Sequence, residues 1–204
     1  KIILTYNDEI LDNILIPSKA HVKTPSSGFQ KKVIDSTEIL DSTEFFDDLT
    51  GAFLSGFFKN GELDSMRLEG MSTTLYHIFE DSVYQGKNET SGDTIIISFK
   101  NKETNNIIVI GGAEGSFYPD TISSTIKSPI FYSASRINYR LLEEETDLDG
   151  YSKIRHDNTE LESGYIKVNW KTNLLNALPQ SNIDQFFKPI NPVIIERGKD
   201  PMTG

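Results

Sequence analysis

Short runs of hydrophobic residues, separated by polar clusters, make up most of the chain. From Gly51 onward these runs are rich in Ile, Val, Phe, Tyr and Thr, and the clusters between them are rich in Gly, Asn and Asp. Short apolar runs separated by such clusters are typical of β-strands joined by tight turns, and they leave little room for long helices. We therefore expect an all-β fold over this part of the chain.

The clearest predicted hairpin covers residues 53–69 and turns at Asn60-Gly61, a pair typical of a two-residue type I′ turn. That turn would pair Lys59 with Glu62, and the pairing would continue along both strands. The further predicted pairs are Phe58–Leu63, Phe57–Asp64, Ser55–Met66, Leu54–Arg67 and Phe53–Leu68. One face would then carry Phe53, Phe57, Met66 and Leu68, and the other face would be mixed but still partly apolar.

A second hairpin is predicted from two apolar runs, 94–99 and 106–110, joined by a polar loop over 101–105. Continuous apolar runs of this kind indicate strands that are buried on both faces. Further strands are predicted at 73–79, 154–155, 160–170 and 174–178.

Two regions have a less regular pattern. Residues 35–49 contain Ile39, Leu40, Phe45 and Phe46, which favours a short helix capped by Ser36 or Ser42, although the β-branched and Asp-rich composition weakens that prediction. Residues 121–150 change from Ser, Thr and Pro to an acidic run ending at Gly150, which indicates the join between two units.

Composition narrows the function classes. The chain has 204 residues, of which 37% are hydrophobic, so it can bury one good core or two small repeated ones. The net charge of −10 opposes binding to nucleic acid and to anionic membrane surfaces. The absence of cysteine excludes disulfides, thiolate metal sites and a cysteine nucleophile. The chain starts without Met, and we expect it to be a fragment of a longer protein.

Motifs for catalysis are weak. His21, His77 and His156 are far apart and lack metal-ligand spacing, and no G-x-S-x-G nucleophile motif is present. Gly111-Gly112 precedes Ser116-Phe117 rather than a helix, so it predicts a tight turn or bulge and not a phosphate cradle. The acidic run at 143–150 predicts a solvated linker more than a calcium loop. A glycosidase-like carboxylate pair stays open as a weaker alternative. We predict no enzymatic activity, no metal and no cofactor.

Two segments resemble a known family. The first is 49–120, with GAFLSGFFKNGELDSMRLEGMSTTLY at 51–76, in which a strand, a short turn and a strand ending in Glu-Gly lead to a tyrosine. The second is 132–173, with YSASRINY at 132–139 and GYSKIRHDNTELESGYIKVNWKTN at 150–173. Both resemble the OstA-like lipopolysaccharide-transport proteins, the family of LptA and of the soluble domain of LptD. Residues 1–48 and 123–129 match nothing in this pattern.

The resemblance implies an open, folded-over antiparallel sheet, a β-jelly roll or β-taco, built from two OstA-like repeats at 1–120 and 121–204. It implies a non-enzymatic, periplasmic or outer-membrane-associated carrier whose apolar groove holds the acyl chains of lipopolysaccharide or a related lipid. Its sheet edges would pair with other OstA-like modules as part of an outer-membrane assembly.

Apolar burial could supply the affinity of such a groove, at about 0.8 kcal/mol per buried CH₂. The candidate groove residues are Phe53, Phe57, Met66, Leu68, Ile97, Phe99, Ile166, Val168 and Trp170. The same residues could instead pack the sheet on itself. The main functional alternative is a β-sandwich binding or adhesin domain for glycan or protein, which an aromatic platform and polar loops would mark.

Overall fold

The structure is a computed structural model, and it describes residues 1–172, 174–179, 190–196 and 201–203. Its described residues form β-strands and no helices, so the all-β prediction is confirmed. No helix in this part of the chain is long and apolar enough to cross a membrane. The strands are β1 (Ile3–Asn7), β2 (Ile10–Ile16), β3 (Ala20–Ile34), β4 (Thr37–Gly51), β5 (Phe53–Lys59), β6 (Glu62–Glu80), β7 (Val83–Lys100), β8 (Glu103–Pro119), β9 (Ile130–Arg140), β10 (Glu145–His156), β11 (Thr159–Asn169), β12 (Leu174–Leu178), β13 (Val193–Glu196) and β14 (Met202–Thr203).

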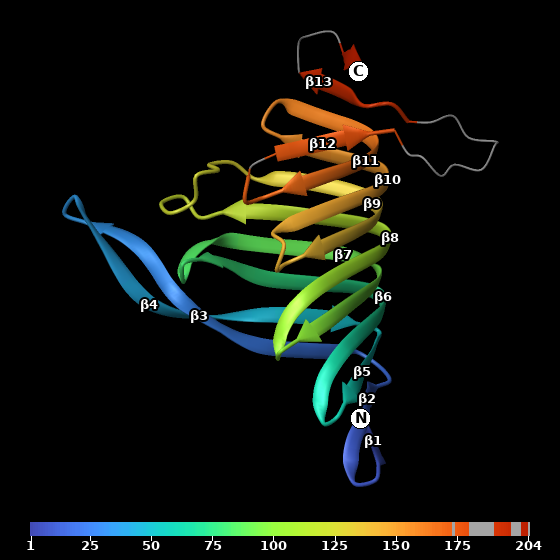
Figure 1. The fold of residues 1–204 in the computed structure, drawn as a ribbon. Helices are drawn as coiled ribbons and strands as arrows, with labels where there is room; N and C mark the ends of the chain where they lie inside the picture. The colour runs from blue at the N-terminus through green and yellow to red at the C-terminus, as the bar shows by residue number, and fades with distance from the viewer. Residues whose placement is uncertain (173, 180–189, 197–200, 204) are drawn as a thin grey trace.

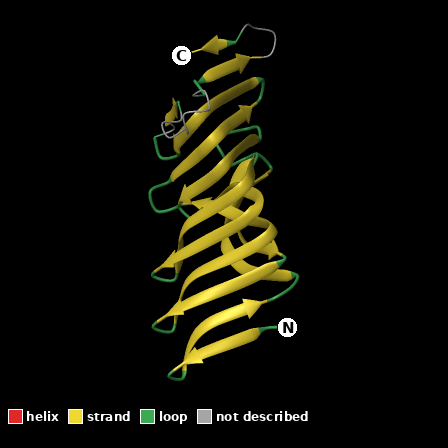
Figure 2. Ribbon diagram, turned by 90° about the vertical axis from the view of Figure 1, so that its right-hand side faces the viewer, coloured by secondary structure: helices red, strands yellow, loops and turns green. Residues whose placement is uncertain are grey.

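One continuous sheet contains all of these strands, and almost all of its pairs are antiparallel. One edge of β6 is covered first by β5 and then by β4, and the other edge pairs with β7. From β7 to β11 each strand pairs with the next in the sequence. The strands stack along a long axis, with β1 at one end and β13 and β14 at the other (Figures 1 and 2).

The long strands bend along one line, which we call the crease. The register shifts there at 70–71 of β6, 111–112 of β8 and 150–151 of β10. Each of these steps is a glycine followed by a second residue, and both have positive φ, from 49° to 82°. Two successive left-handed residues turn the strand sharply, and glycine adopts that conformation without steric cost. The steps fold the sheet over on itself, as Figure 1 shows at its right side.

The crease divides the sheet into two wings. Wing 1 contains β5 and the segments 62–69, 94–100, 103–110, 136–140, 145–149 and 165–169, and β2 and β12 extend it. Wing 2 contains 48–51, 72–80, 83–91, 113–119, 130–134, 152–156 and 159–163, and β13 extends it. The folded-over sheet predicted from the sequence is therefore confirmed.

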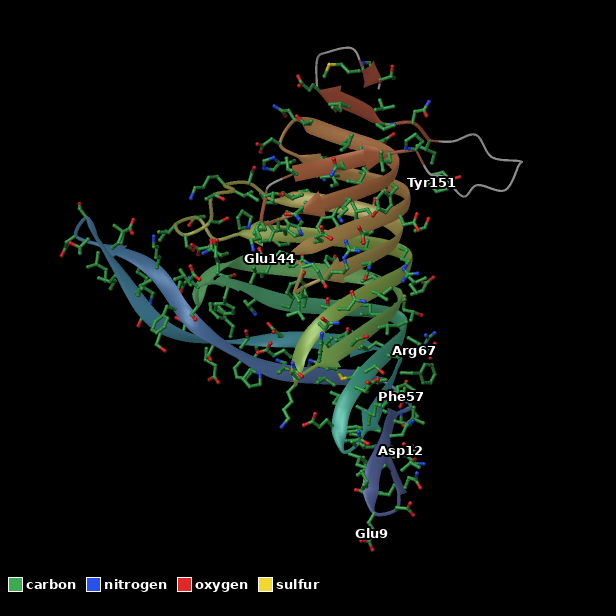
Figure 3. The ribbon with its side chains drawn as sticks, viewed as in Figure 1. Glu9, Asp12, Phe57, Arg67, Glu144 and Tyr151 are labelled. Atoms are coloured by element: carbon green, nitrogen blue, oxygen red, sulfur yellow. The ribbon has the colours of Figure 1, made fainter. Side chains whose placement is uncertain are left out.

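Small residues line the inside of the crease. Buried there are Ala20, Ser72, Ala113, Ala134, Ser152 and Ser163, each at most 7% exposed. At Gly92 an added Cβ would lie 2.6 Å from Cγ1 of Val109. Small side chains let the two wings approach closely at the fold line. On the outside, Met71 and Tyr151 stand 87% and 68% exposed, and Figure 3 shows Tyr151 at the outer margin of the sheet.

Residues 35 and 36 form a turn and residues 37–49 belong to a strand, so the short helix predicted at 35–49 is wrong. β4 pairs with β3 along its whole length, from Thr37 to Gly51. The β-branched and aromatic residues of this segment favour a strand once a partner strand is available. β3 and β4 make a long hairpin, and we call its distal part, 23–47, the arm. Figure 1 shows the arm projecting beyond the stacked strands.

The arm is fastened to the end of wing 2. The backbone N–H of Phe29 donates to the carbonyl oxygen of Ser82 over 2.8 Å. Where β4 leaves β6, Asp47 Oδ1 accepts from the backbone N–H of His77 at 2.9 Å, which replaces the missing ladder bond. The ring of Phe45 stacks on His77 and on Tyr84, with centroids 4.5 and 4.6 Å apart.

The predicted join at 121–150 is only partly irregular. Residues 120–129 form the connection, and β9 begins at Ile130. β8 pairs with β9 from Asn106 to Phe117, so the sheet continues across residue 120. The division into repeats at 1–120 and 121–204 stays a prediction, and Asn173, at the end of the second resembling segment, lies outside the described residues.

Candidate functional site

The inner face of wing 1 carries an uninterrupted apolar row across nine strands. Each residue faces the next in the ladder: Ile16, Leu54, Leu68, Ile95, Val109, Ile137, Leu148, Ile166 and Ala177. From Leu68 to Ile166 every member is at most 1% exposed. Because strand residues alternate between faces, an unbroken register of this kind aligns all of them on one side of the sheet.

A second row lies two residues further from the crease. It contains Ile14, Gly56, Met66, Ile97, Ile107, Tyr139, Thr146, Val168 and Leu175. Phe99 packs against the same core from the end of β7. The two rows form an apolar lane that runs along the long axis of the molecule, perpendicular to the strands.

A bulge in the first hairpin changes the predicted register. The Asn60-Gly61 turn is confirmed, with φ of 52° and 79°, and Phe58 faces Leu63 as expected. Asp64 is then an extra residue, so Phe57 faces Ser65 and Phe53 faces Glu69. The turn residues determine the first two pairs, Lys59–Glu62 and Phe58–Leu63. Beyond them, the single extra residue shifts the pairing by one, so the side chains of β5 lie on the opposite face from the one predicted relative to β6.

The predicted groove residues are therefore divided between the two faces. Phe53 and Phe57 lie on the outer face, 50% and 44% exposed, and their predicted place beside Met66 and Leu68 is wrong. Figure 3 shows Phe57 on the outside of the sheet. Six other candidates lie on the inner face, in the two rows or beside them: Met66, Leu68, Ile97, Phe99, Ile166 and Val168.

Trp170 follows β11 at the free end of wing 1. Its Nε1 donates to Thr146 Oγ1 over 2.8 Å, and its backbone N–H donates to the carbonyl oxygen of Glu144 at 2.8 Å. The residue is 37% exposed. Trp170 therefore stands at the rim of the interior, where an aromatic ring can contact both the apolar lane and solvent.

The inner face of wing 2 is much more polar at β6 and β7. Ser72, Thr74, Asn88 and Thr90 are all at most 4% exposed. Thr74 faces Thr90 across the ladder, and Tyr76 faces Asn88. Apolar residues return toward the ends of this wing, with Val22 and Leu49 at one end and Ile154, Leu161 and Ile194 at the other. We call the group Ser72, Thr74, Tyr76, Asn88, Thr90, Tyr132 and Tyr139 the polar belt.

Four side chains of the polar belt form a closed ring of hydrogen bonds. Tyr139 of wing 1 donates to the hydroxyl of Tyr132 of wing 2 over 2.9 Å. Tyr132 donates to Asn88 Oδ1, and Asn88 Nδ2 donates to Thr90 Oγ1 at 2.9 Å. Since the Tyr139 proton is already used, Thr90 donates to Tyr139 at 3.0 Å. The ring joins the wings across the interior, and its members polarise one another.

Gly115 makes room for this ring of hydrogen bonds. An added Cβ there would lie 2.1 Å from Cε2 of Tyr132, so the tyrosine ring lies directly against the glycine backbone. Burial raises the pKa of Tyr76, Tyr132 and Tyr139, and all three hydroxyls are therefore protonated donors at neutral pH. The sequence offered no signal for the polar belt, because its residues come from three strands, β6, β7 and β9, and its pairing depends on the crease.

An ionic cluster occupies the outer face of wing 1. Arg140 Nη1 lies 2.6 Å from Asp147 Oδ2, and Lys167 Nζ lies 2.9 Å from Glu145 Oε2. The pKa of Glu145 is lowered chiefly by its hydrogen bond with Lys167. The prediction that 143–150 is a solvated linker is thus wrong from residue 145 onward, where the acidic side chains pair with cations on neighbouring strands of the sheet.

The outer face of wing 2 has a shallow hollow of about 620 Å³. Most of the residues that line it are polar types, among them His21, Asp48, Thr73, Glu89 and Glu114. None of the lining residues is aromatic except the imidazole of His21, which is paired with Asp48 at 2.8 Å. Among the described residues no three His, Asp or Glu side chains gather as metal ligands, and the three histidines lie apart.

The comparisons with known proteins identify the fold. No family model matches the chain, and no curated protein matches it. A solved structure does match, that of LptH from Pseudomonas aeruginosa, described as the LptA-homologous periplasmic component of the lipopolysaccharide transport device. The match covers 74% of this chain and 94% of LptH, with a TM-score of 0.56 and 12% identity. The chain therefore has the LptA-like fold that the OstA-like resemblance implied.

Proposed function

We propose that this protein is a non-enzymatic lipid carrier that holds the acyl chains of lipopolysaccharide, or of a related lipid, between its two wings. The observation that carries the proposal is the apolar lane of wing 1, which crosses nine strands without a charged residue. A lane perpendicular to the strands offers the same contact at every strand, as an extended hydrocarbon chain requires.

The energetics suit this function. Each buried methylene contributes about 0.8 kcal/mol, so a chain with about ten methylenes gains on the order of 8 kcal/mol before ordering costs. The middle of both rows is buried, from Leu68 to Ile166 in the first and from Ile97 to Val168 in the second. An acyl chain therefore enters as the free ends of the wings part, while the crease keeps its hydrogen bonds. Trp170 at the rim is the first aromatic contact for an entering chain.

The two ends of the sheet suit a chain of modules. β1 and the β13–β14 pair leave strand edges at opposite ends of the long axis. Apolar side chains stand exposed beside both, including Leu4 at 48% and Met202 at 55%. We propose that these edges pair with other OstA-like modules, in the periplasm or at the outer membrane, because edge strands readily accept a further strand. The similarity to LptH, a periplasmic component, supports this location.

Native mass spectrometry with added lipopolysaccharide tests the proposal. The informative variants are Met66→Asp and Phe57→Asp, which come from the same hairpin but from opposite faces. A charge inside the lane should abolish lipid adducts, whereas a charge on the outer face should leave them. Circular dichroism establishes that both variants fold. Folded wild-type protein that forms no adduct, or equal loss in both variants, would contradict the proposal.

The adhesin-like alternative receives less support. The hollow on the outer face of wing 2 is polar, but the aromatic platform expected for glycan recognition does not line it. The weaker glycosidase alternative would need a pair of carboxylates in a cleft, and no observation selects two of the hollow's three carboxylates, Asp48, Glu89 and Glu114, as such a pair.

A further inference from the structure

The interior contains an unexplained set of buried polar groups. Ser72 Oγ and Thr74 Oγ1 are buried and have no hydrogen-bond partner, in residues that are 0% and 4% exposed. Both belong to the inner face of wing 2: Thr74 faces Thr90 of the hydrogen-bonded ring, and Ser72 lies two residues before Thr74 in β6, opposite Gly92. Leaving a buried hydroxyl unpaired costs about 1–3 kcal/mol, so a carrier that needed only an apolar interior would be more stable with Ala and Val here.

The chemistry of the belt indicates what could pair with these hydroxyls. Its seven side chains are hydroxyls, phenols and one carboxamide, and none of them carries a charge. Lys and Arg, which a phosphate or carboxylate would require, are missing from this set. The belt can donate to and accept from a neutral group such as a hydroxyl or a carbonyl oxygen. A neutral polar group buried here would recover the hydrogen bonds that a plain methylene leaves unmade.

The position of the belt relative to the lane fits such a ligand. Tyr139 belongs both to the second row of wing 1 and to the ring, so the belt faces the lane directly. Met66, Ile97 and Ile107 continue the lane on one side of Tyr139, and Val168 continues it on the other. A chain lying along the lane therefore passes apolar contacts, then the belt, and then apolar contacts again.

We propose that the polar belt is a specificity site for acyl chains that carry a neutral hydrogen-bonding group, a hydroxyl or a carbonyl, which binds to Ser72 and Thr74. This inference rests on the proposed lipid-carrier function and names the substrate class of that same interior. When the wings part, the bond from Tyr139 to Tyr132 breaks, and the ligand group joins the hydroxyls that the ring leaves behind. The polar belt thus favours acyl chains that carry a hydroxyl or carbonyl group over acyl chains that carry neither.

Titration with two fatty acids tests the inference. Tetradecanoate and 3-hydroxytetradecanoate differ by one hydroxyl and share the carboxylate and the chain length. The whole chain should bind 3-hydroxytetradecanoate roughly threefold to tenfold more tightly than tetradecanoate, because one net hydrogen bond supplies a ratio of that size. Displacement of a fluorescent fatty acid measures both dissociation constants under identical conditions.

Isosteric variants locate the effect. Thr74→Val keeps the shape of the side chain and removes its hydroxyl, so the ratio of the two dissociation constants should fall close to one. Thr73→Val, one residue away on the outer face, is the matched control and should keep the preference. Tyr139→Phe removes the hydroxyl that joins the wings, and it should also reduce the preference; it serves as the second test if Thr74→Val fails to fold.

The outcomes separate the two proposals. If neither acid binds to wild-type protein, the lipid-carrier function itself is contradicted. If both acids bind equally, or if the preference survives in both Thr74→Val and Tyr139→Phe, the carrier function stands and the specificity site is overturned.

Discussion

The two wings share one sheet and one crease, yet their inner faces differ in chemistry. Wing 1 presents Leu68, Ile95 and Val109 in one apolar row, whereas across the crease β6 and β7 present Ser72, Thr90 and Asn88. A sheet that only packed on itself would gain from apolar residues on both sides. In our proposals, this difference corresponds to binding of the acyl chain by wing 1 and recognition of polar groups by wing 2.

Truncation in wing 1 should have the largest effect on stability. Leu68 is fully buried in the middle of the first row. Leu68→Ala should lower the free energy of unfolding by about 2–5 kcal/mol, because it removes buried methyl groups and leaves a cavity. Phe57→Ala, on the outer face of the same hairpin, should cost much less. Urea denaturation of both variants checks this, and equal losses would contradict the assignment of faces.

The crease should tolerate substitution unevenly. Gly70 has φ of 81°, and an added Cβ would lie 2.7 Å from Cβ of Ala52. Gly70→Ala should therefore cost about 1–2 kcal/mol for the left-handed backbone, and more for the clash. Gly112 also has positive φ, 55°, but nothing lies within 4 Å of its added Cβ. Gly112→Ala should show only the backbone cost in thermal denaturation; if it loses as much as Gly70→Ala, close packing at the crease is contradicted.

Alkaline pH should weaken the contact between the wings through the buried tyrosines. Burial raises the pKa of Tyr76, Tyr132 and Tyr139 above the ordinary value of 10. Below pH 10 these groups are neutral in both the folded and the unfolded protein, so they do not make the free energy of unfolding depend on pH there. Above pH 10 the unfolded chain ionises first, and stability should fall as pH rises.

Ultraviolet absorbance at alkaline pH measures this directly. Of the eight tyrosines in the chain, the three in the polar belt should ionise only as the protein unfolds. Tyr139→Phe removes one of these late groups and is the control. Ionisation of all tyrosines in the folded protein near pH 10 would show that the belt is open to water.

The smallest expected effect is a gain. Thr74→Val replaces an unpaired buried hydroxyl with a methyl group of the same shape. The variant should be more stable than the wild type, by on the order of 1 kcal/mol, because the cost of the unpaired hydroxyl disappears. Thr73→Val on the exposed face removes a solvent-accessible hydrogen bond to Thr50 Oγ1 (2.6 Å), so it should not raise the melting temperature. A destabilised Thr74→Val would indicate that Thr74 serves the fold rather than a ligand.

The sequence predicted the positions of the strands more accurately than the face of the sheet on which each side chain lies. Alternation and turn residues located the hairpin at Asn60-Gly61, the strand at 174–178 and the bulge at Gly111-Gly112, because these signals are local. The bulge at Asp64 has no glycine and no turn signal, so the faces of Phe53 and Phe57 were assigned wrongly. The strand at 37–51 depends on a partner strand rather than on local propensity, and the helix prediction failed there.

The candidate site was predictable only in its apolar half. Leu68, Ile97, Ile166 and Val168 are apolar residues in strong strand patterns, so they could be selected from the sequence. The polar belt could not, since Asn88, Thr90, Tyr132 and Tyr139 meet only after the sheet folds along its crease. Long-range contacts of this type leave no local pattern in the sequence.

Photo-crosslinking with a fatty acid that carries a diazirine near the end of its chain tests the central claim most directly. Peptide mass spectrometry then maps where the chain lies. We predict adducts on the inner rows of wing 1, at residues such as Leu68, Ile95 and Ile166, with competition by unlabelled lipopolysaccharide. Adducts confined to the outer face, at Phe53 or Phe57, would contradict the account and assign lipid contact to the outside of the sheet.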